Sequence, residues 1–147
     1  MRKGATAALI IPGAYLLDQA TKQLAQSMIE PGDAVRVSSF LDLVHMHNTG
    51  AAFSMGVTLG NGFFIAMASI AIAVIAYMLW KDMEDPLSLS LILGGAAGNL
   101  TDRIRIGSVH DFLYFHMGRH YWPAFNVADS ALTVGVGLIL IRALRKK

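Results

Sequence analysis

Two short motifs place an amide and a carboxylate three residues apart, beside apolar stretches of the chain. "GNLTD" contains Asn99 and Asp102, and "FNVAD" contains Asn126 and Asp129. Residues three apart project from the same face of a helix. An ionisable group inside a bilayer costs several kcal/mol, so such a group is a candidate for function. The polar residues that stand in or beside apolar stretches are Asp18, Asn99, Asp102, Arg103, Asn126 and Asp129.

Three carboxylates can meet at one boundary of the membrane. "VHDFLYF" places Asp111 in the connection between the two motifs, near Asp102 and Asp129. Two carboxylates at one site share a proton, because both cannot ionise cheaply. The ionised member can activate a water while the protonated member polarises a carbonyl, which is the chemistry of an aspartic peptidase. By residue type and position alone, Asp102 and Asp111 are equally available as the partner of Asp129. The groups expected to orient them are Asn99, Arg103 and Asn126.

Other functions are open to the same residues. Asp102 beside Arg103 fits an orienting ion pair, and the asparagines fit hydrogen bonds between helices. Charged membrane residues also mark ion paths, so a small ion- or proton-coupled transporter is the alternative function. Transport sites usually lie near the midplane and at internal repeats, whereas these charges gather at one face and no repeat is visible. A non-catalytic assembly subunit is a third possibility.

Metal, thiol and serine chemistry have little support. The chain has no cysteine, which removes thiolate ligands and a cysteine nucleophile. His45 and His47 share one side of a strand, and His116 and His120 stand at helical i, i+4 spacing, so either pair could bind a metal. No H-E-x-x-H pattern accompanies them, and no serine stands in a G-x-S-x-G setting. We expect interfacial histidines, no metal and no cofactor.

The elements that position these residues are predicted from four apolar blocks. The chain is 54% hydrophobic and 15% charged, against about 25% charged in soluble domains. The block 62–80 has 19 uncharged residues, enough to cross a hydrocarbon layer of roughly 30 Å. Residues 1–147 therefore predict a single all-α membrane domain, a four-transmembrane-helix bundle. The predicted spans are about 4–21, 62–80, 87–101 and 124–141.

Basic residues favour one orientation. With both termini cytoplasmic, the inner segments hold seven of the 12 Lys and Arg in few residues, as the positive-inside rule requires. These residues explain the basic balance better than nucleic acid does. The loops 22–61 and 102–123 then lie outside. "MRK" could begin a cleavable signal sequence, but Asp18 closes the apolar run and no cleavage site follows, so an uncleaved span is expected.

The first outer loop is too long for a plain connection. "FLDLVHMHN" alternates over residues 40–48, which is typical of an extended strand. It predicts a small extracytoplasmic β-sheet between helices one and two, followed by a turn at "NTG". In the third block, Gly94, Gly95 and Gly98 predict close packing of helices.

Five motifs resemble those of a known family. "DQATK" (18–22), "NTGAAFS" (48–54), "GGAAGNLTDR" (94–103), "VHDF" (109–112) and "FNVADS" (125–130) occur in this order. Together they resemble the signature motifs of lipoprotein signal peptidase, the bacterial signal peptidase II. The resemblance implies a four-span aspartic endopeptidase of the bacterial inner membrane, with its site near the periplasmic face. Such an enzyme removes signal peptides from prolipoproteins, just before a diacylglyceryl-modified cysteine.

The resemblance also implies roles for residues. The catalytic aspartates match Asp111 and Asp129. Supporting or substrate-binding positions match Asp18, Lys22, Asn48, Asn99, Asp102, Arg103 and Asn126. The expected partners are prolipoprotein signal peptides with a diacylglyceryl-cysteine and membrane lipids, with no nucleic acid and a monomeric chain.

Overall fold

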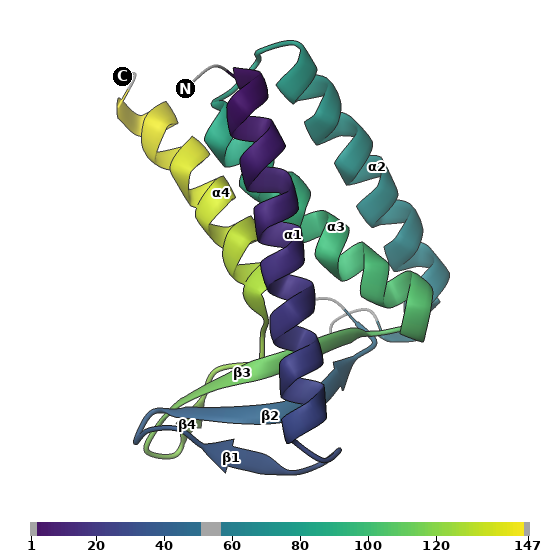
Figure 1. The fold of residues 1–147 in the computed structure, drawn as a ribbon, viewed down its shortest axis with the longest axis vertical. Coiled ribbons are helices and arrows are strands. Elements are labelled where there is room, and N and C mark those ends of the chain that lie inside the picture. The colour runs from purple at the N-terminus through teal and green to yellow at the C-terminus, as the bar shows by residue number, and fades with distance from the viewer. Residues whose placement is uncertain (1–2, 51–56, 146–147) are drawn as a thin grey trace.

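The computed structural model describes residues 3–50 and 57–145, in which four α-helices stand on a small sheet (Figure 1). The N- and C-termini lie together at the end of the bundle opposite to the strands. Arg2, Lys146, Lys147 and residues 51–54 of the "NTGAAFS" motif lie outside the described residues. The elements are α1 (Lys3–Met28), β1 (Ala34–Arg36), β2 (Leu41–Asn48), η2 (Val57–Leu59), α2 (Gly60–Trp80), α3 (Pro86–Ile106), β3 (Val109–Met117), β4 (His120–Tyr121) and α4 (Val127–Arg145).

The four predicted spans each fall on a helix. Within the described residues, Gly60–Trp80 and Val127–Arg145 are the two helices long and apolar enough to cross a membrane. Of the 21 residues in α2, Leu79 alone is buried in the protein, so its apolar side chains need another apolar surround. The helices α1 and α3 instead bury charged side chains, among them Asp18 in α1 and Asp102 in α3. Their crossing of the membrane stays a prediction.

The third helix is the centre of the bundle, because α3 packs against α1, α2 and α4. Its glycines allow this close approach, as predicted. A Cβ on Gly94 would lie 2.7 Å from the Cβ of Ala14, and one on Gly95 would lie 2.5 Å from the carbonyl oxygen of Ala128. Both distances are shorter than real side chains tolerate, so only glycine lets these backbones meet.

Both ends of α3 are capped by residues with the required chemistry. The Asp85 carboxylate accepts a hydrogen bond from the Ser88 backbone N–H at 2.9 Å, and Pro86 occupies the first turn, where its missing N–H costs nothing. Gly107 ends the helix with φ of 78°, a left-handed conformation that glycine adopts without strain. Arg142 of α4 pairs with Asp85, which joins the two helices at the end that carries the termini.

The sheet corrects the prediction in one respect. Its order is β1-β2-β3-β4, and each paired neighbour is antiparallel. Only β1 and β2 lie between the first two helices; β3 and β4 come from the connection between α3 and α4, which the sequence analysis left without strands. The register places Met46 opposite Asp111 and Asn48 opposite Val109, so the first outer loop is joined directly to the strand that carries Asp111.

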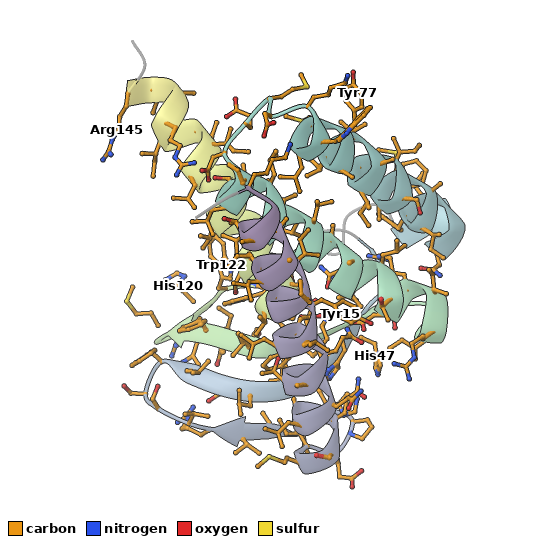
Figure 2. The ribbon with its side chains drawn as sticks, turned by 45° about the horizontal axis from the view of Figure 1, so that its top comes forward. Tyr15, His47, Tyr77, His120, Trp122 and Arg145 are labelled. Atoms are coloured by element: carbon orange, nitrogen blue, oxygen red, sulfur yellow. The ribbon has the colours of Figure 1, made fainter. Side chains whose placement is uncertain are left out.

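A small apolar cluster holds the sheet against the bundle. Ala25 and Ile29, in and just after α1, pack against Phe112 of β3. Figure 2 shows Tyr77 and Arg145 toward the end of the bundle that carries the termini, and His47 and His120 beside the strands. The last turns of α1 therefore reach beyond the predicted span 4–21 and serve as the support for the strands.

Candidate active site

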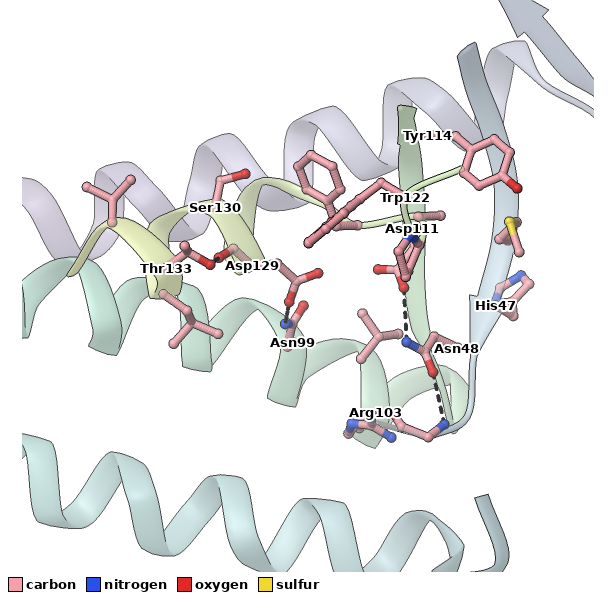
Figure 3. Close-up of a pocket in the computed structure, with 18 residues that line it drawn as sticks. His47, Asn48, Asn99, Arg103, Asp111, Tyr114, Trp122, Asp129, Ser130 and Thr133 are labelled. Atoms are coloured by element: carbon pink, nitrogen blue, oxygen red, sulfur yellow. Dashed lines mark hydrogen bonds between the residues drawn. The ribbon is translucent and has the colours of Figure 1, made fainter. Parts of the chain in front are cut away.

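A cavity of about 980 Å³ opens where β2, β3 and the start of α4 meet (Figure 3). One part of its wall is polar and contains Asp111 and Asp129. The other part is apolar or aromatic and includes Phe125, Leu132 and Val134. The remaining lining residues are Met46, His47, Asn48, Gly50, Asn99, Arg103, Val109, Tyr114, Trp122, Pro123, Ala124, Ser130 and Thr133. Such a wall suits a mainly apolar chain that presents one polar bond.

Asp111 is held by two amides. It lies on β3 with 3% of its surface exposed. Asn126 donates from Nδ2 to Asp111 Oδ1 at 2.7 Å, and Asn48 donates from Nδ2 to Asp111 Oδ2 at 3.1 Å. Both carboxyl oxygens therefore accept one N–H from a neutral group, which fixes the position of the carboxyl without pairing it with a cation.

Asp129 is held in the same manner, by the helix that carries it. Asn99 donates from Nδ2 to Asp129 Oδ1 at 2.7 Å. The backbone N–H of Asn126 donates to Asp129 Oδ2 at 3.2 Å, and the Asn126 Oδ1 accepts from the backbone N–H of Asp129 at 2.9 Å. This reciprocal pair is a capping box, which begins α4 at a defined residue. The spacing of "FNVAD" thus starts the helix and orients the carboxylate together.

The electrostatics of the cavity affect Asp111. Its pKa rises to about 7, first because burial disfavours the charged form and then because the charge of Asp129 lies nearby. The hydrogen bonds from Asn48 and Asn126 oppose this rise. A carboxyl with such a pKa can carry a proton at neutral pH, as one member of a proton-sharing pair must.

Behind this wall, three charged residues form a buried network. Lys22 Nζ lies 2.8 Å from Asp18 Oδ2 and 2.7 Å from Asp102 Oδ2. Asp18 Oδ1 also accepts from the backbone N–H of Ala128 at 2.8 Å, which satisfies an N–H in the first turn of α4. Asp102 Oδ2 accepts from the backbone N–H of His110 at 3.3 Å. The network therefore connects to the residues that precede both cavity aspartates in the chain.

Two features of this network differ from the sequence analysis. The ion pair expected between Asp102 and Arg103 is wrong in its partner, since consecutive helical residues face different directions and Asp102 pairs with Lys22. Gln19 was missed: its Nε2 lies 3.1 Å from Asp102 Oδ1 and 3.2 Å from Asp18 Oδ2. Its position in "DQATK", next to Asp18 and three before Lys22, was the available signal.

Arg103 secures the turn that carries Asn48. Its Nη2 donates to the carbonyl oxygen of Gly50, and its guanidinium lies 4.5 Å from the centre of the Phe64 ring in α2. The Gly50 N–H in turn donates to Asn48 Oδ1 at 3.0 Å, which leaves the Asn48 amide nitrogen directed to Asp111. The predicted turn at "NTG" is thus linked to α3 and α2 through one arginine.

The histidines do not form the predicted metal pairs. His116 and His120 lie on strands β3 and β4, so their helical spacing does not apply, and His116 is buried beside Asp42 at 3.4 Å. His45 and His47 pack their rings around His110. Across residues 3–50 and 57–145, no group of three His, Cys, Asp or Glu side chains is arranged to hold a metal ion.

The fold and the cavity place the protein among membrane enzymes of known structure. Two solved bacterial membrane enzymes superpose with TM-scores of 0.88 and 0.85 at 34% and 33% identity. The alignments cover 96% of this chain and 88% of the first structure, and 97% of this chain and 95% of the second. Two helices of this chain are also long and apolar enough to cross a membrane. The class is therefore a bacterial-type membrane enzyme.

The family follows from the sequence comparisons. The profile of signal peptidase (SPase) II matches residues 10–145. A lipoprotein signal peptidase of Thermodesulfovibrio yellowstonii is 44% identical over 131 residues, with 89% of each chain covered. One of Anaplasma phagocytophilum is 36% identical, with 100% of this chain and 97% of the relative covered. This chain belongs to the signal peptidase II family.

Proposed function

We propose that the chain is a membrane-embedded aspartic endopeptidase that removes signal peptides from diacylglyceryl-modified bacterial prolipoproteins. Membership of the signal peptidase II family supports the reaction and the substrate class. The observation that carries the catalytic type is that Asp111 and Asp129 line one cavity and each has both oxygens bonded to N–H groups. The transporter alternative finds no support among the related proteins.

In the proposed reaction, Asp111 and Asp129 share one proton. The ionised carboxylate takes a proton from a water, whose oxygen attacks the carbonyl carbon of the scissile peptide bond. The protonated carboxyl gives its proton to the carbonyl oxygen, which forms a tetrahedral intermediate. A proton then passes to the nitrogen, the C–N bond breaks, and the signal peptide leaves with a new carboxyl group.

Several contacts favour Asp111 over Asp102 as the partner of Asp129. Asp102 Oδ2 accepts from Lys22 and from the His110 N–H, and Asp102 Oδ1 accepts from Gln19. Its carboxylate is therefore occupied, with a cation bound to it, and it does not contribute to the cavity wall. A carboxylate paired with an ammonium is a poor general base, because the ion pair stabilises its charged form.

The apolar wall of the cavity suits the substrate. A signal peptide is an apolar segment, and the wall on α4 presents Leu132 and Val134 beside the polar groups. We take the peptide to approach along α4 while the loop around Trp122 and the strand β2 hold its other side. The lipidated cysteine then lies in the bilayer with the surrounding membrane lipids.

The membrane arrangement belongs to the same proposal. Four helices cross the bacterial inner membrane, both termini are cytoplasmic, and the cavity lies near the outer face. The basic residues Lys3 and Arg142 at the end that carries the termini support this orientation by the positive-inside rule. The proposed catalytic groups all come from one chain, which supports action as a monomer.

The direct test uses purified protein in detergent with a diacylglyceryl-modified prolipoprotein. Asp111→Asn and Asp129→Asn should each abolish cleavage while the variants still fold, and Asp33→Asn, an exposed aspartate outside the cavity, is the matched control. Chelators should leave cleavage unchanged. Full activity in either dyad variant would contradict the aspartic mechanism and would favour a non-catalytic role in an assembly.

A further inference from the structure

Lys22 is a buried cation with three acceptors around it. Its side chain is 3% exposed. Besides the oxygens of Asp18 and Asp102, at 2.8 and 2.7 Å, it contacts Asn99 Oδ1 at 3.0 Å. An ammonium has three N–H donors and no acceptor, so these three oxygens satisfy it completely. The two carboxylates balance its charge, and the third contact is directed to the residue that binds Asp129.

The contact with Asn99 has a consequence for its amide. A side-chain amide can present either its oxygen or its nitrogen to a neighbour, and the two orientations are nearly equal in shape. Lys22 can only donate, so the oxygen of Asn99 must face it, and the nitrogen is left to donate to Asp129 Oδ1 at 2.7 Å. Asn126 Nδ2 donates to the same oxygen at 3.2 Å, but a charged donor makes the stronger bond.

We propose that Lys22 is a positioning residue for the peptidase reaction, fixing the Asn99 amide so that Asp129 Oδ1 always accepts a hydrogen bond. This inference rests on the proposed aspartic dyad. If the amide were reversed, its carbonyl oxygen would face Asp129 Oδ1, and the two oxygens would repel unless a proton lay between them. Lys22 thereby keeps that oxygen free of the shared proton.

The location of Lys22 separates this role from substrate binding. Lys22 is absent from the wall of the large cavity and lines a second one of about 90 Å³, between α1 and α3. It does not touch the bound peptide in the proposed reaction. The loss of its contact with Asn99 should therefore lower kcat and leave KM unchanged, whereas a general loss of structure would alter both.

Lys22 also influences the other titrating groups of the site. Its charge lowers the pKa of Asp111, against the larger effects of burial and Asp129. The ionisable groups near it come from every element packed around it, namely Asp18, Asp102, His110, Asp111 and Asp129. Without the cation, the pH dependence of kcat should move to higher pH, because both members of the dyad then bind protons more readily.

The test must avoid leaving two buried carboxylates without a cation. Lys22→Met together with Asp102→Asn keeps the formal charge of the Asp18–Lys22–Asp102 network at −1 and removes the donor to Asn99. Asp102→Asn alone is the matched control. A third protein, with Lys22→Gln in place of Lys22→Met, restores a neutral donor at the same position. Thermal unfolding in detergent shows whether each protein is folded before kcat, KM and the pH profile are compared.

We expect the Met pair to lose about 100-fold in kcat relative to Asp102→Asn, as for a small misplacement of a catalytic group, with KM unchanged and the profile at higher pH. The Gln pair should recover much of this loss. Equal kcat and pH profiles in the Met pair and in Asp102→Asn would overturn the proposal, and so would a Gln pair that behaves like the Met pair. If the Met pair does not fold, Lys22→Met with Asp18→Asn gives the same comparison against Asp18→Asn.

The same experiment separates this inference from the proposed function. Activity in Asp111→Asn or Asp129→Asn would remove the dyad and the inference with it. Inactive dyad variants together with an unaffected Met pair would leave the aspartic mechanism in place and reject only the role of Lys22.

Discussion

A single methyl group at Gly98 should disturb the site from behind. A Cβ built on Gly98 lies 2.4 Å from Asp18 Oδ2 and 3.1 Å from Asp18 Cγ. The nearest comfortable approach is about 3.4 Å, so the Asp18 carboxylate must move by about 1 Å. That carboxylate is bonded to Lys22 and to the backbone N–H of Ala128, each at 2.8 Å. It is held on one side by α1 and on the other by α4.

The size of the effect follows from these two contacts. A shift of about 1 Å takes a 2.8 Å contact beyond the roughly 3.2 Å limit of a good N–H···O bond. A hydrogen bond to a charged group contributes about 1.5–3 kcal/mol, and the gain of alanine over glycine in a helix offsets about 1 kcal/mol. Gly98→Ala should therefore destabilise the protein by about 1–4 kcal/mol. Because Ala128 precedes Asp129, activity should fall as well, by up to about 100-fold for a misplacement of about 1 Å.

The measurement compares Gly98→Ala with Gly137→Ala. A Cβ on Gly137, in α4, meets nothing within 4 Å, so this control should be neutral or more stable, by up to about 1 kcal/mol. Thermal unfolding in detergent reports stability, and cleavage of a lipidated prolipoprotein reports activity. If both variants melt and cleave alike, the tight coupling of Asp18 to the start of α4 is wrong.

Three further outcomes are expected. Asp111 binds a proton up to a pKa of about 7 when folded but only to about 4 when unfolded, so stability falls as pH rises through this window. Asp111→Asn should then melt above the native protein at pH 8. Burial, followed by His45 and His47, lowers the pKa of His110 from 6.5 to about 4, so stability is lost as pH falls through that range, and melting of His110→Phe should depend less on pH there. Asp85→Ala removes the cap of α3 and should lower stability by about 1 kcal/mol, as measured by unfolding at pH 7.

The helices could be predicted because each has an apolar stretch that needs no partner far away in the chain. Their ends could not be predicted from the same stretches. The first predicted span stops at residue 21, whereas α1 continues to Met28. Hydropathy loses the helix where Gln and Lys begin, yet Lys22 is buried by its ion pairs and Ala25 by the sheet. Tertiary contacts, which no local pattern contains, extend the helix.

The second half of the sheet could not be read from the sequence for a similar reason. "VHDFLYFHM" is mixed rather than alternating, since both faces of β3 are covered near its start, where Val109 and Phe112 are buried. Its hydrogen-bonding partner, β2, lies more than 60 residues earlier in the chain. Pairing over that separation depends on the bundle, which brings the ends of α1 and α3 together. The register of Asp111 opposite Met46 is thus a product of the whole fold.

The choice between Asp102 and Asp111 shows what spacing alone leaves undecided. Both aspartates stand in polar motifs between α3 and α4, and both can reach the outer end of the bundle. Their neighbours separate them: Asp102 contacts the ammonium of Lys22, whereas Asp111 contacts the amides of Asn48 and Asn126. The family resemblance favoured the same aspartate, but from motif position and without a physical reason.

That reason lies in the use of amides beside the cavity. A cation in contact with Asp111 or Asp129 would favour the charged form of both, and no proton would remain to polarise a carbonyl. A carboxyl without any donor would be free to rotate out of reach. Amides avoid both outcomes, since they orient a carboxyl through N–H bonds and carry no charge. In the described part of the chain, the nearby cations are bound elsewhere, Lys22 to Asp18 and Asp102 and Arg103 to the Gly50 carbonyl. Their charge therefore reaches the dyad only through a neutral neighbour, which orients the carboxyls and lets one of them keep its proton.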